Sequence, residues 1–478
     1  MRAGFRWVMP VSAMMLAGCA SVADAPPPFP VMASQYSSPQ ALQAQAEDSA
    51  ALLGSWWLLF DAPELNGLVK QALAESTEAR MAVARMREAR ALREAALTQY
   101  RPQGGVEART ERRGSRRLDG AKGEGGAADL GTQGNSALGL QVSWELDVFG
   151  RGTAHARQAE GEYAAALYSA HAERAALVAE VARTWFEVQR LAAALEDARA
   201  TVAIQQNLQH LLERKLDRGL APLSELARVE AGLWAAQADE VALQARWDAG
   251  RRALLVLVGL GDASLDELPL AAQPTQPPAL PQALPSELLA RRPDVLMARA
   301  QMNAAAGGLQ LSRLALWPSI TLTPGIGLNW QNHAGSLRTG YWSLAGNVLL
   351  PVLDRPRLLA QARAQGARAE QAVITYEQTV QRAFSETDQA LLQMASDLPR
   401  LGMLQRAQDR AEAAFHASEK GYRAGVFDLM TVLDAERTYR QARVALTDAR
   451  GMALNHAVQV FQALGGGWQA DADWIPQG

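Results

Sequence analysis

The sequence predicts a mainly α-helical chain with four long β-strands, arranged as two copies of one helix–strand–strand–long helix–helix unit. Three observations predict this fold, namely an internal repeat, alanine-rich stretches of helical composition and segments of strict apolar–polar alternation. A chain of 478 residues would otherwise be expected to form two or three globular domains. The repeat favours a duplicated unit instead.

The repeat lies at an offset of 206 residues. Residues 142–151 (VSWELDVFGR) align with 348–357 (VLLPVLDRPR), and residues 214–226 align with 420–432. Only two copies are present, so the chain is not a solenoid of many repeats. We expect these divisions along the chain: a signal peptide at 1–18, a lipid-anchored segment at 19–62, repeat 1 at 63–268, a Pro-rich linker at 269–285, repeat 2 at 286–468 and a C-terminal tail at 469–478.

Each copy contains one very long helical stretch. Alanine, the best helix former, dominates these segments. A stretch of about 65 residues makes a rod of roughly 100 Å, far longer than a compact domain needs. Pro399 is expected to interrupt the second rod. The predicted helices are 64–99, 152–216 and 223–258 in the first copy, and 286–315, 357–422 and 429–463 in the second.

Apolar and polar residues alternate over 138–148 and again over 319–330. This pattern is typical of a transmembrane β-strand, although a half-buried strand of a soluble sandwich has the same period. Length favours the membrane, because soluble strands average about five or six residues. A strand at 103–111 is predicted from repeat symmetry alone. Residues 112–135 are predicted as an extracellular loop, whose arginines could contact lipopolysaccharide phosphates.

The predicted strands imply a membrane wall that one chain cannot complete. Four strands do not close a barrel, and an open sheet edge is not viable in lipid. Two, three or four copies would give 8, 12 or 16 strands, and the periodicity does not choose among these numbers. Aromatic residues suited to an interfacial girdle are Trp317, Trp330, Tyr341 and Trp342.

The first residues have the features of an export signal. Arg2 and Arg6 precede a short apolar stretch that ends in LAGC, which resembles the bacterial lipobox with Cys19 as the lipidated residue. Cys19 is the only cysteine, so no internal disulfide framework can form. The next residue is Ala20 rather than Asp, which by the lipoprotein sorting rule implies the outer membrane. One lipidated cysteine anchors a chain but does not span a bilayer.

The composition argues against several function classes. The net charge of −3 gives no basic surface suited to nucleic acid. The six histidines lie far apart without metal-ligand spacing, and no phosphate-cradling glycine loop or nucleophile elbow is present. We therefore expect no enzyme activity, no cofactor and no metal site.

Several motifs in one order resemble the outer membrane efflux protein family (the TolC/OprM-like outer membrane factors), in the lipoprotein branch that serves resistance-nodulation-division pumps. The resemblance extends over about residues 55–468. The motifs are WWLLFDAPELNGL at 56–68, ELDVFGR at 145–151, RRPD at 291–294, WPSITL at 317–322 and ALGGGW at 463–468.

The resemblance implies a homotrimer, with a 12-stranded barrel in the outer membrane that a periplasmic α-helical barrel continues. It implies a passive duct for drugs or other small toxic molecules, supplied by an inner-membrane efflux pump and a periplasmic adaptor protein. Outer-membrane lipid is the remaining partner. The alternatives are the duct of a type I protein secretion system and, from another class, a coiled-coil periplasmic scaffold lipoprotein.

The resemblance also implies roles at the turns that end the long helices. Asp434 matches the family's constriction aspartate, which a trimer would repeat as a ring of three charges. Where the family often has a second aspartate, this chain has Thr431. A plainer interpretation is that glycines here cap helices and acids favour helix starts. The expected gate residues are Asp434, Asp428, Glu225 and Arg423, and the expected adaptor-contact residues are Arg218, Gly219, Tyr422 and Gly425.

Overall fold

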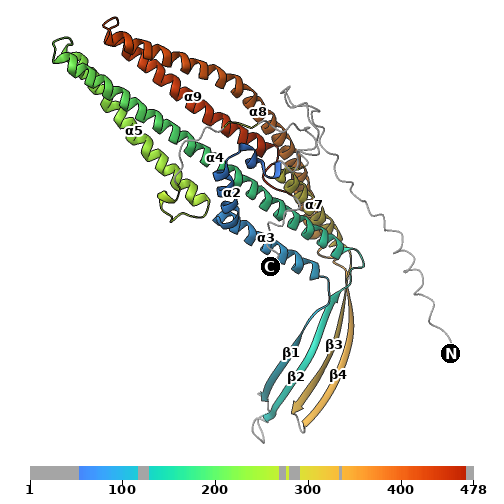
Figure 1. The fold of residues 1–478 in the computed structure, drawn as a ribbon. Coiled ribbons are helices and arrows are strands. Elements are labelled where there is room, and N and C mark those ends of the chain that lie inside the picture. Colours follow the sequence, from blue (N-terminus) through green and yellow to red (C-terminus); the bar gives the residue numbers. More distant parts are fainter. Residues whose placement is uncertain (1–52, 117–128, 269–275, 279–290, 333–335, 470–478) are drawn as a thin grey trace, which may run out of the picture. The chain divides into compact units, whose positions relative to one another are not determined.

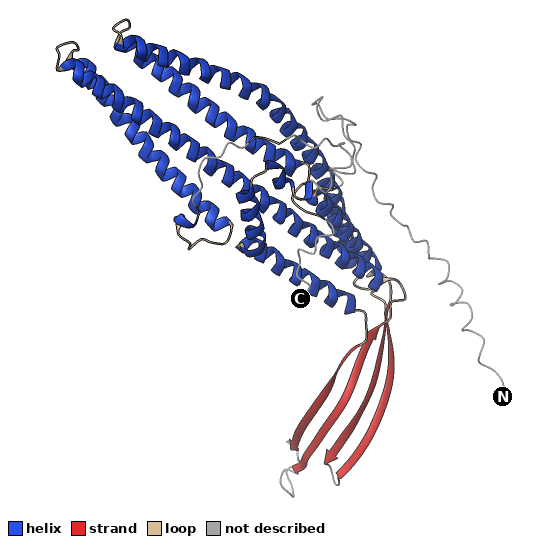
Figure 2. Cartoon of the chain, viewed as in Figure 1, coloured by secondary structure: helices blue, strands red, loops and turns tan. Residues whose placement is uncertain are grey.

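The computed structural model describes residues 53–116, 129–268, 276–278, 291–332 and 336–469 (Figure 1). These residues belong to one compact unit, Ala33–Gly478. The predicted signal peptide, Cys19 and most of the Pro-rich linker lie outside the described residues. Within those residues the fold is mainly helical with four strands, which confirms the predicted class (Figure 2).

The first helical stretch is interrupted. After a 3-10 helix, η2 (Trp56–Phe60), the chain forms α2 (Pro63–Glu75) and α3 (Thr77–Thr98). The single helix expected over 64–99 is therefore wrong at Ser76, which has an extended conformation with φ −60° and ψ 147°. Its hydroxyl accepts a 3.1 Å hydrogen bond from the Ala79 amide. Serine favours this capping role over the helix interior, so the helix restarts.

Two long helices and their shorter partners make up most of the helical part. α4 (Arg151–Leu216) turns back into α5 (Leu223–Leu257), and α8 (Arg355–Arg423) turns back into α9 (Leu429–Ala463) (Figure 1). The lengths agree with the prediction to within a few residues. In the second copy, α7 (Pro293–Leu314) takes the place of α2 and α3.

α8 continues through Pro399, so the predicted break is wrong. Proline removes one amide donor and crowds the preceding turn. The surrounding residues nevertheless pack firmly, since Met394 and Asp397 are buried and the Asp397 carboxylate lies 2.7 Å from His456 Nδ1 of α9. Packing against α9 therefore holds the helix through the proline.

The main core joins the two ends of the described chain. Trp56 is fully buried and stacks on Phe461, with ring centroids 5.3 Å apart, and both rings contact Phe60. The Gly467 amide donates a 2.9 Å hydrogen bond to the Leu53 carbonyl. Burial of such large side chains stabilises the fold by about 1.5–3 kcal/mol each. The tryptophan motif at 56–57 and the glycine motif at 465–467 thus form one structural unit.

α4 is the central helix, and α2, α3, α5, α7 and α9 all pack against it. Its closest approach is to α7. A Cβ added to Gly161 would lie 2.6 Å from the Ala304 amide nitrogen, and one added to Gly307 would lie 2.7 Å from the Gln158 amide nitrogen. Neither glycine has a positive φ. The two backbones are therefore in contact, and glycine is required there for space.

The strands form one antiparallel sheet in the order β1-β2-β3-β4. They are β1 (Gln103–Arg116), β2 (Asp129–Glu145), β3 (Ser319–Asn332) and β4 (Ser336–Leu349). The loop predicted at 112–135 is therefore too long, because β1 and β2 continue to pair as far as Arg116 and Asp129. Cross-strand backbone hydrogen bonds do not depend on side-chain polarity, so glycine and arginine continue the ladder. β2 also ends earlier than predicted, at Glu145.

Arg151 connects the sheet to the helices. From the first residue of α4, its guanidinium donates hydrogen bonds to the Glu145 carboxylate at 2.8 Å and to the Trp317 carbonyl at 2.7 Å. It also donates to the Leu314 carbonyl, at the end of α7. One side chain therefore ties the start of α4 to the ends of α7 and β2 and to the start of β3. None of the described helices has the length and apolarity needed to cross a bilayer.

The α4–α7 contact is testable by a pair of glycine substitutions. We expect Gly161→Ala to destabilise the protein by about 1–3 kcal/mol, because the added methyl group meets backbone. Gly402→Ala in α8 is the matched control, since its added Cβ would point into open space among the described residues, and we expect it to stabilise by about 0.5–1 kcal/mol. Thermal unfolding followed by circular dichroism measures both, and an equal stabilisation in both variants would contradict close contact.

Candidate channel wall and helix tips

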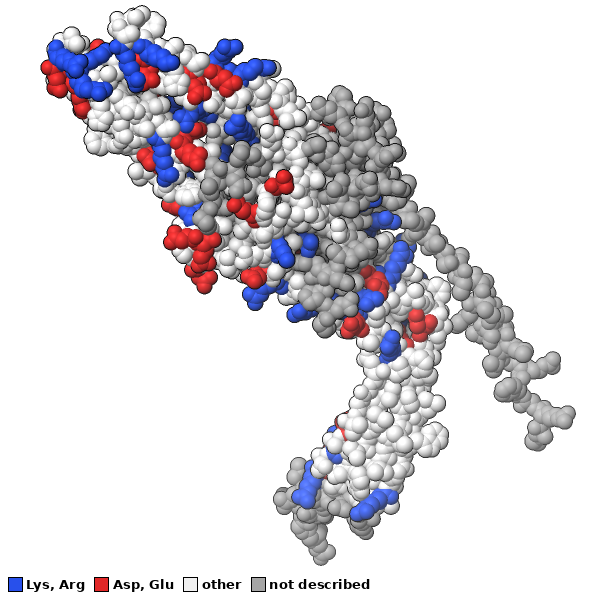
Figure 3. Space-filling model, in the orientation of Figure 1, with Lys and Arg blue, Asp and Glu red and all other residues white. Residues whose placement is uncertain are grey.

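The sheet has one apolar and one polar face. Its register places four apolar residues in a row across the strands, namely Val106, Leu140, Ile326 and Trp342. Their exposed fractions range from 44 % for Leu140 to 81 % for Trp342. In the view of Figure 3 the middle of the strands carries few charged side chains, whereas the helices carry many. A continuous apolar surface of this extent indicates a non-aqueous environment.

The polar face consists largely of glycine and uncharged polar residues. Gln141, Gly325 and Ser343 form one row, and Glu107, Gly139, Gly327 and Tyr341 form the next. Tyr341 therefore does not share the lipid-side girdle expected from the sequence. Adjacent residues of a strand point to opposite faces, so Tyr341 and Trp342 cannot both face lipid.

Glycines end both helices at the far end of the helical part. Gly219 has φ +66° after α4, and Gly425 has φ +77° after α8. The Leu220 amide donates to the Lys215 carbonyl and the Val426 amide to the Gly421 carbonyl, each at 2.8 Å. These are Schellman-type caps, which require a left-handed residue. The capping role expected for both glycines is confirmed.

The two turns contact each other through Lys215 and Tyr422. The ammonium of Lys215 lies 3.4 Å from the centre of the Tyr422 ring and donates a 3.3 Å hydrogen bond to its carbonyl. Burial, together with the negative charge of Glu225, raises the pKa of Tyr422. The Glu225 carboxylate therefore lies near Tyr422, which is only 5 % exposed. Lys215 belongs to none of the family motifs, so this contact was not predicted from the sequence.

The expected gate acids have different local partners. Asp428 caps α9, and its carboxylate accepts hydrogen bonds of 2.6 and 2.8 Å from the Thr431 hydroxyl and amide. These bonds, the hydroxyl first, lower the pKa of Asp428. Asp434 lies one to two turns further along and pairs with Arg437 at 2.7 Å, with 67 % of its side chain exposed. Thr431, the departure from the family pattern, therefore orients Asp428.

Arg423 is paired within its own helix, with Glu419 at 2.6 Å. The ion pair of Arg423 is therefore formed with its own helix and not with Asp428 or Asp434 of the same chain. Arg218 lies exposed in the turn between α4 and α5. Exposed apolar residues accompany these charges at the tips, namely Leu220, Leu223, Val426, Phe427 and Met430.

A buried acid that no sequence motif marks lies between α4 and α9. Glu436 is 4 % exposed, and Gln205 of α4 donates a hydrogen bond to it. Oε1 of Glu436 and Oε1 of Gln205 are both buried without a partner among the described residues. Burial raises the pKa of Glu436, with Arg440 and the Gln205 hydrogen bond opposing. Glu436 follows the buried Leu429 and Val432 at coiled-coil spacing, which could have revealed it.

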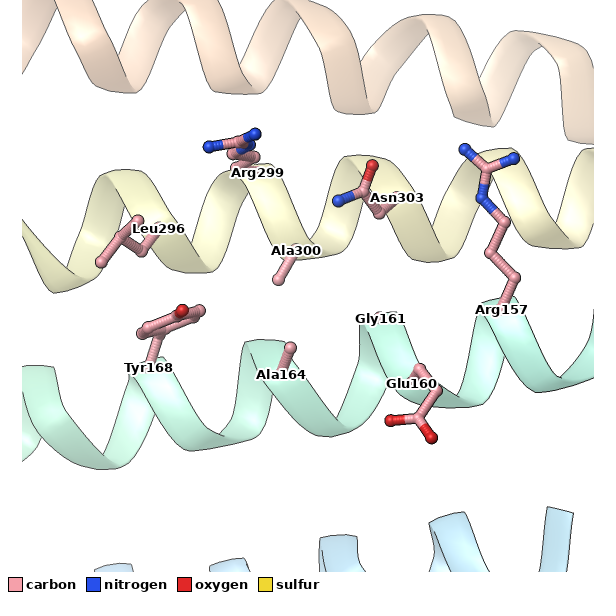
Figure 4. Close-up of a pocket in the computed structure, with 9 residues that line it drawn as sticks. All are labelled: Arg157, Glu160, Gly161, Ala164, Tyr168, Leu296, Arg299, Ala300 and Asn303. Atoms are coloured by element: carbon pink, nitrogen blue, oxygen red, sulfur yellow. The ribbon is translucent and has the colours of Figure 1, made fainter. Parts of the chain in front are cut away.

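A groove of about 490 Å³ lies between α4 and α7, beside their glycine contact (Figure 4). Small residues on both helices, Gly161, Ala164 and Ala300, leave it open. At its rim Glu160 is held by Arg93 of α3, with hydrogen bonds of 2.6 and 2.8 Å. In the described part of the chain, no three of His, Cys, Asp and Glu are grouped so that they could hold a metal ion.

A family model decides the identification. The model of the outer membrane efflux protein matches the chain twice, at residues 68–260 and 284–466. The chain belongs to the outer membrane efflux protein family. Its two matches correspond to the two halves of the duplicated fold. This is a family of outer-membrane channel proteins, not of enzymes.

Relatives of this family align with the chain over nearly its whole length. The pyoverdine export outer membrane protein OpmQ of Pseudomonas aeruginosa is 30 % identical over 465 residues, which cover 96 % of this chain and 97 % of that protein. The cation efflux system protein CusC of Escherichia coli is 27 % identical over 463 residues, or 96 % and 97 % of the two chains.

The solved structure of the outer-membrane channel OprN superimposes with a TM-score of 0.79 at 27 % identity, covering 92 % of this chain and 98 % of that one. Together with the family match, these relatives identify the chain as an outer-membrane component of an efflux system. The predicted family, fold class, efflux function and outer-membrane location are confirmed.

The buried acid of this efflux protein gives a stability prediction. Because the pKa of Glu436 is raised in the folded state, its stability contribution is fully present below the ordinary value of 4.5 and is lost as pH rises through the folded pKa. We expect Glu436→Gln to raise the free energy of unfolding at pH 7 by about 1–3 kcal/mol, since the amide carries no charge and supplies a donor.

Asp434→Asn is the control, because this exposed acid of the same helix should change stability by less than about 0.5 kcal/mol. Thermal unfolding measured between pH 4 and pH 8 distinguishes the two residues. A gain for Glu436→Gln that does not grow with pH would contradict the assignment of a buried, proton-binding acid.

Proposed function

We propose that three copies of this chain form the outer-membrane duct of a tripartite efflux system. The duct is passive, and it receives small molecules from an inner-membrane pump through a periplasmic adaptor protein. The observation that carries the proposal is the two-faced, four-stranded sheet with two unpaired edges, joined to helices far longer than a compact domain needs.

The sheet edges support assembly from several copies. β1 and β4 are the two ends of the strand order, so the outer edge of each lacks a partner in the part of the chain that the structure describes. Unpaired backbone groups in lipid cost several kcal/mol each, which only a closed barrel avoids. If β4 of one copy pairs with β1 of the next, three copies give 12 strands. The number three comes from the family resemblance.

The helical part supports the same arrangement. α5 packs on α4, α4 on α9, and α9 on α8, so the four helices lie in sequence with α5 and α8 at the two flanks. α5 exposes Trp234 and Val241, each 71 %, and α8 exposes Ile374 and Leu398. Contact between the α5 flank of one copy and the α8 flank of the next would cover these side chains and continue the barrel.

The tips support docking of an adaptor. Leu220, Leu223 and Val426 expose about 70 % of their surface at the two turns, beside Arg218 and Arg423. Apolar side chains ringed by charges are typical of a protein contact surface. We infer that an adaptor's helical hairpins bind here, with Gly219, Tyr422 and Gly425 shaping the turns.

Asp434 is the proposed gate residue. Its carboxylate is exposed, near the tip, and would appear three times around the axis of a trimer. A ring of carboxylates attracts cations and repels anions. Asp428, Glu225 and Arg423 would contribute to the local field, Asp428 while also capping α9.

The substrate class follows from the proposed role rather than from a binding site. OpmQ is named for pyoverdine export and CusC for cation efflux, so relatives of one fold serve different cargo. A passive duct leaves selection to the pump. We therefore propose drugs or other small toxic molecules as cargo and no resident cofactor.

The overall proposal is tested by two measurements on the full chain. Purified protein should run as a heat-modifiable trimer and form channels in planar lipid bilayers. A deletion strain should become more susceptible to a panel of small toxic compounds. A folded protein that stays monomeric in mild detergent and forms no channels would exclude the duct.

Cys19 is predicted to carry the lipid anchor. Cys19→Ser removes the only thiol in the chain, so we expect complete loss of radiolabelled palmitate incorporation. Ala20→Ser leaves the thiol in place and should retain the label. Persistent labelling of the Cys19→Ser protein would refute lipidation at this residue.

The charge at Asp434 is predicted to control ion preference. Asp434→Asn removes the carboxylate and leaves Arg437 without its partner, so the preference of single channels for cations should fall. Asp262→Asn, an exposed acid far from the tip, is the control. Reversal potentials in asymmetric KCl measure the preference. Unchanged currents and selectivity in both Asp434→Asn and Arg423→Gln would remove these residues from the gate.

A further inference from the structure

Tyr341 lies flat across two neighbouring strands on the polar face of the sheet. It stands in one row with Gly327 and Gly139, directly opposite in the register. A Cβ added to Gly327 would lie 2.7 Å from the Tyr341 hydroxyl oxygen and 2.8 Å from Cε1. One added to Gly139 would lie 2.9 Å from the same hydroxyl oxygen. The ring thus covers β3, and its hydroxyl reaches β2.

Glycine is needed at these two positions for space and not for backbone conformation. Neither Gly139 nor Gly327 has a positive φ. A glycine inside a strand weakens it unless another group approaches closely. An aromatic ring lying over a glycine of the next strand restores the lost packing. The two glycines and the tyrosine therefore form one arrangement.

The arrangement faces the interior of the proposed channel. Trp342, the next residue, points to the opposite face with Ile326 and Leu140 and is 81 % exposed. If that apolar face contacts lipid, Tyr341 faces the lumen. This inference rests on the proposed function, which supplies the closed barrel.

We propose that Tyr341 sets the free bore of the channel at mid-barrel, and that Gly139 and Gly327 keep the bore wide by letting the ring lie flat. A side chain at either glycine would lift the ring away from the wall. In a trimer three rings would rise together and narrow the lumen, so solutes near the size limit would be held back. Tyr341 thereby sets an upper size for solutes in the duct, while the choice among smaller molecules stays with the pump.

Gly139→Ala is the more specific test of the two glycine variants, because it disturbs little besides Tyr341. Its added methyl group meets the Tyr341 hydroxyl, and the next nearest atom outside that ring is the Ile326 carbonyl oxygen at 3.5 Å. The methyl group of Gly327→Ala would also lie 2.7 Å from the Leu138 carbonyl oxygen and so strain the backbone. Gly340→Ala is the matched control on the apolar face, because Leu328 is the only described residue near its added Cβ, at 3.7 Å.

The test measures access to a thiol beyond the tyrosine. Ala345 is exposed on the same face as Tyr341 and lies four residues nearer the helices, so Ala345→Cys reports on solutes that enter from the outer mouth. Intact cells carrying this reporter are labelled with a small maleimide and with bulky polyethylene glycol maleimides. The parent protein without the reporter gives the background of Cys19.

We expect Gly139→Ala to slow labelling by the bulky reagent several-fold, with small-reagent labelling unchanged. Gly340→Ala should label like the parent reporter. Gly139→Ala combined with Tyr341→Ala should recover the parent rate or exceed it, because the obstructing ring is gone. If Gly139→Ala does not assemble, Tyr341→Ala alone should label faster with the bulky reagent than the parent does.

Two outcomes separate the inference from the proposed function. If the small maleimide labels every variant and the bulky reagent labels all at one rate, Tyr341 does not set the bore, and the channel itself stands. If the small maleimide never labels Ala345→Cys in the assembled protein, the polar face is not a lumen, and both proposals fail. Slow labelling that persists after removal of Tyr341 also overturns the inference.

Discussion

The unpaired backbone edges of β1 and β4 are the constraint on which the rest of the structure depends. Each of the four strands is hydrogen-bonded to its neighbours within the sheet, yet the outer edges of β1 and β4 have no partner among the described residues. For an outer-membrane protein, lipid offers no replacement for those bonds. A ring of copies is the simplest arrangement that removes both edges at once. In such a ring the apolar face of the sheet contacts lipid on the outside, and the polar face contacts water on the inside.

The helices follow the same repeated order as the strands of the sheet. Each pair of strands is flanked by helices in the same sequence, because the chain is one unit repeated. At Arg151 the chain changes from the two-residue period of a strand to the 3.6-residue period of a helix. Its guanidinium bonds to Glu145 of the first copy and to Trp317 of the second. The wall therefore continues from strands to helices without a separate domain between them.

Element type and length were readable from the sequence, since repeat and periodicity act along the chain. The helices of 35 to 69 residues and the alternating strands were recognised in this way. The interruptions of the helices were not recognised, because they depend on the residues around them. Ser76 breaks a helix by capping, whereas Pro399 does not break one that α9 supports. The face of Tyr341 and the burial of Glu436 likewise depend on register and on a partner helix. The family motifs located the tip, whereas the hydrogen bonds there depend on side-chain positions that no motif encodes.

The glycine contact between α4 and α7 has a mechanical consequence. With no side chain between the two backbones, Gly161 and Gly307 bring α4 and α7 into direct contact, so that any tilt of α4 relative to α7 has this contact as its pivot. The tip of α4 lies about 80 Å from that pivot at 1.5 Å per residue. A tilt of about one degree therefore sweeps the tip through about 1.4 Å. If three copies close a ring as proposed, a small rotation close to the sheet is enough, by leverage alone, to widen or narrow the opening at the helix tips.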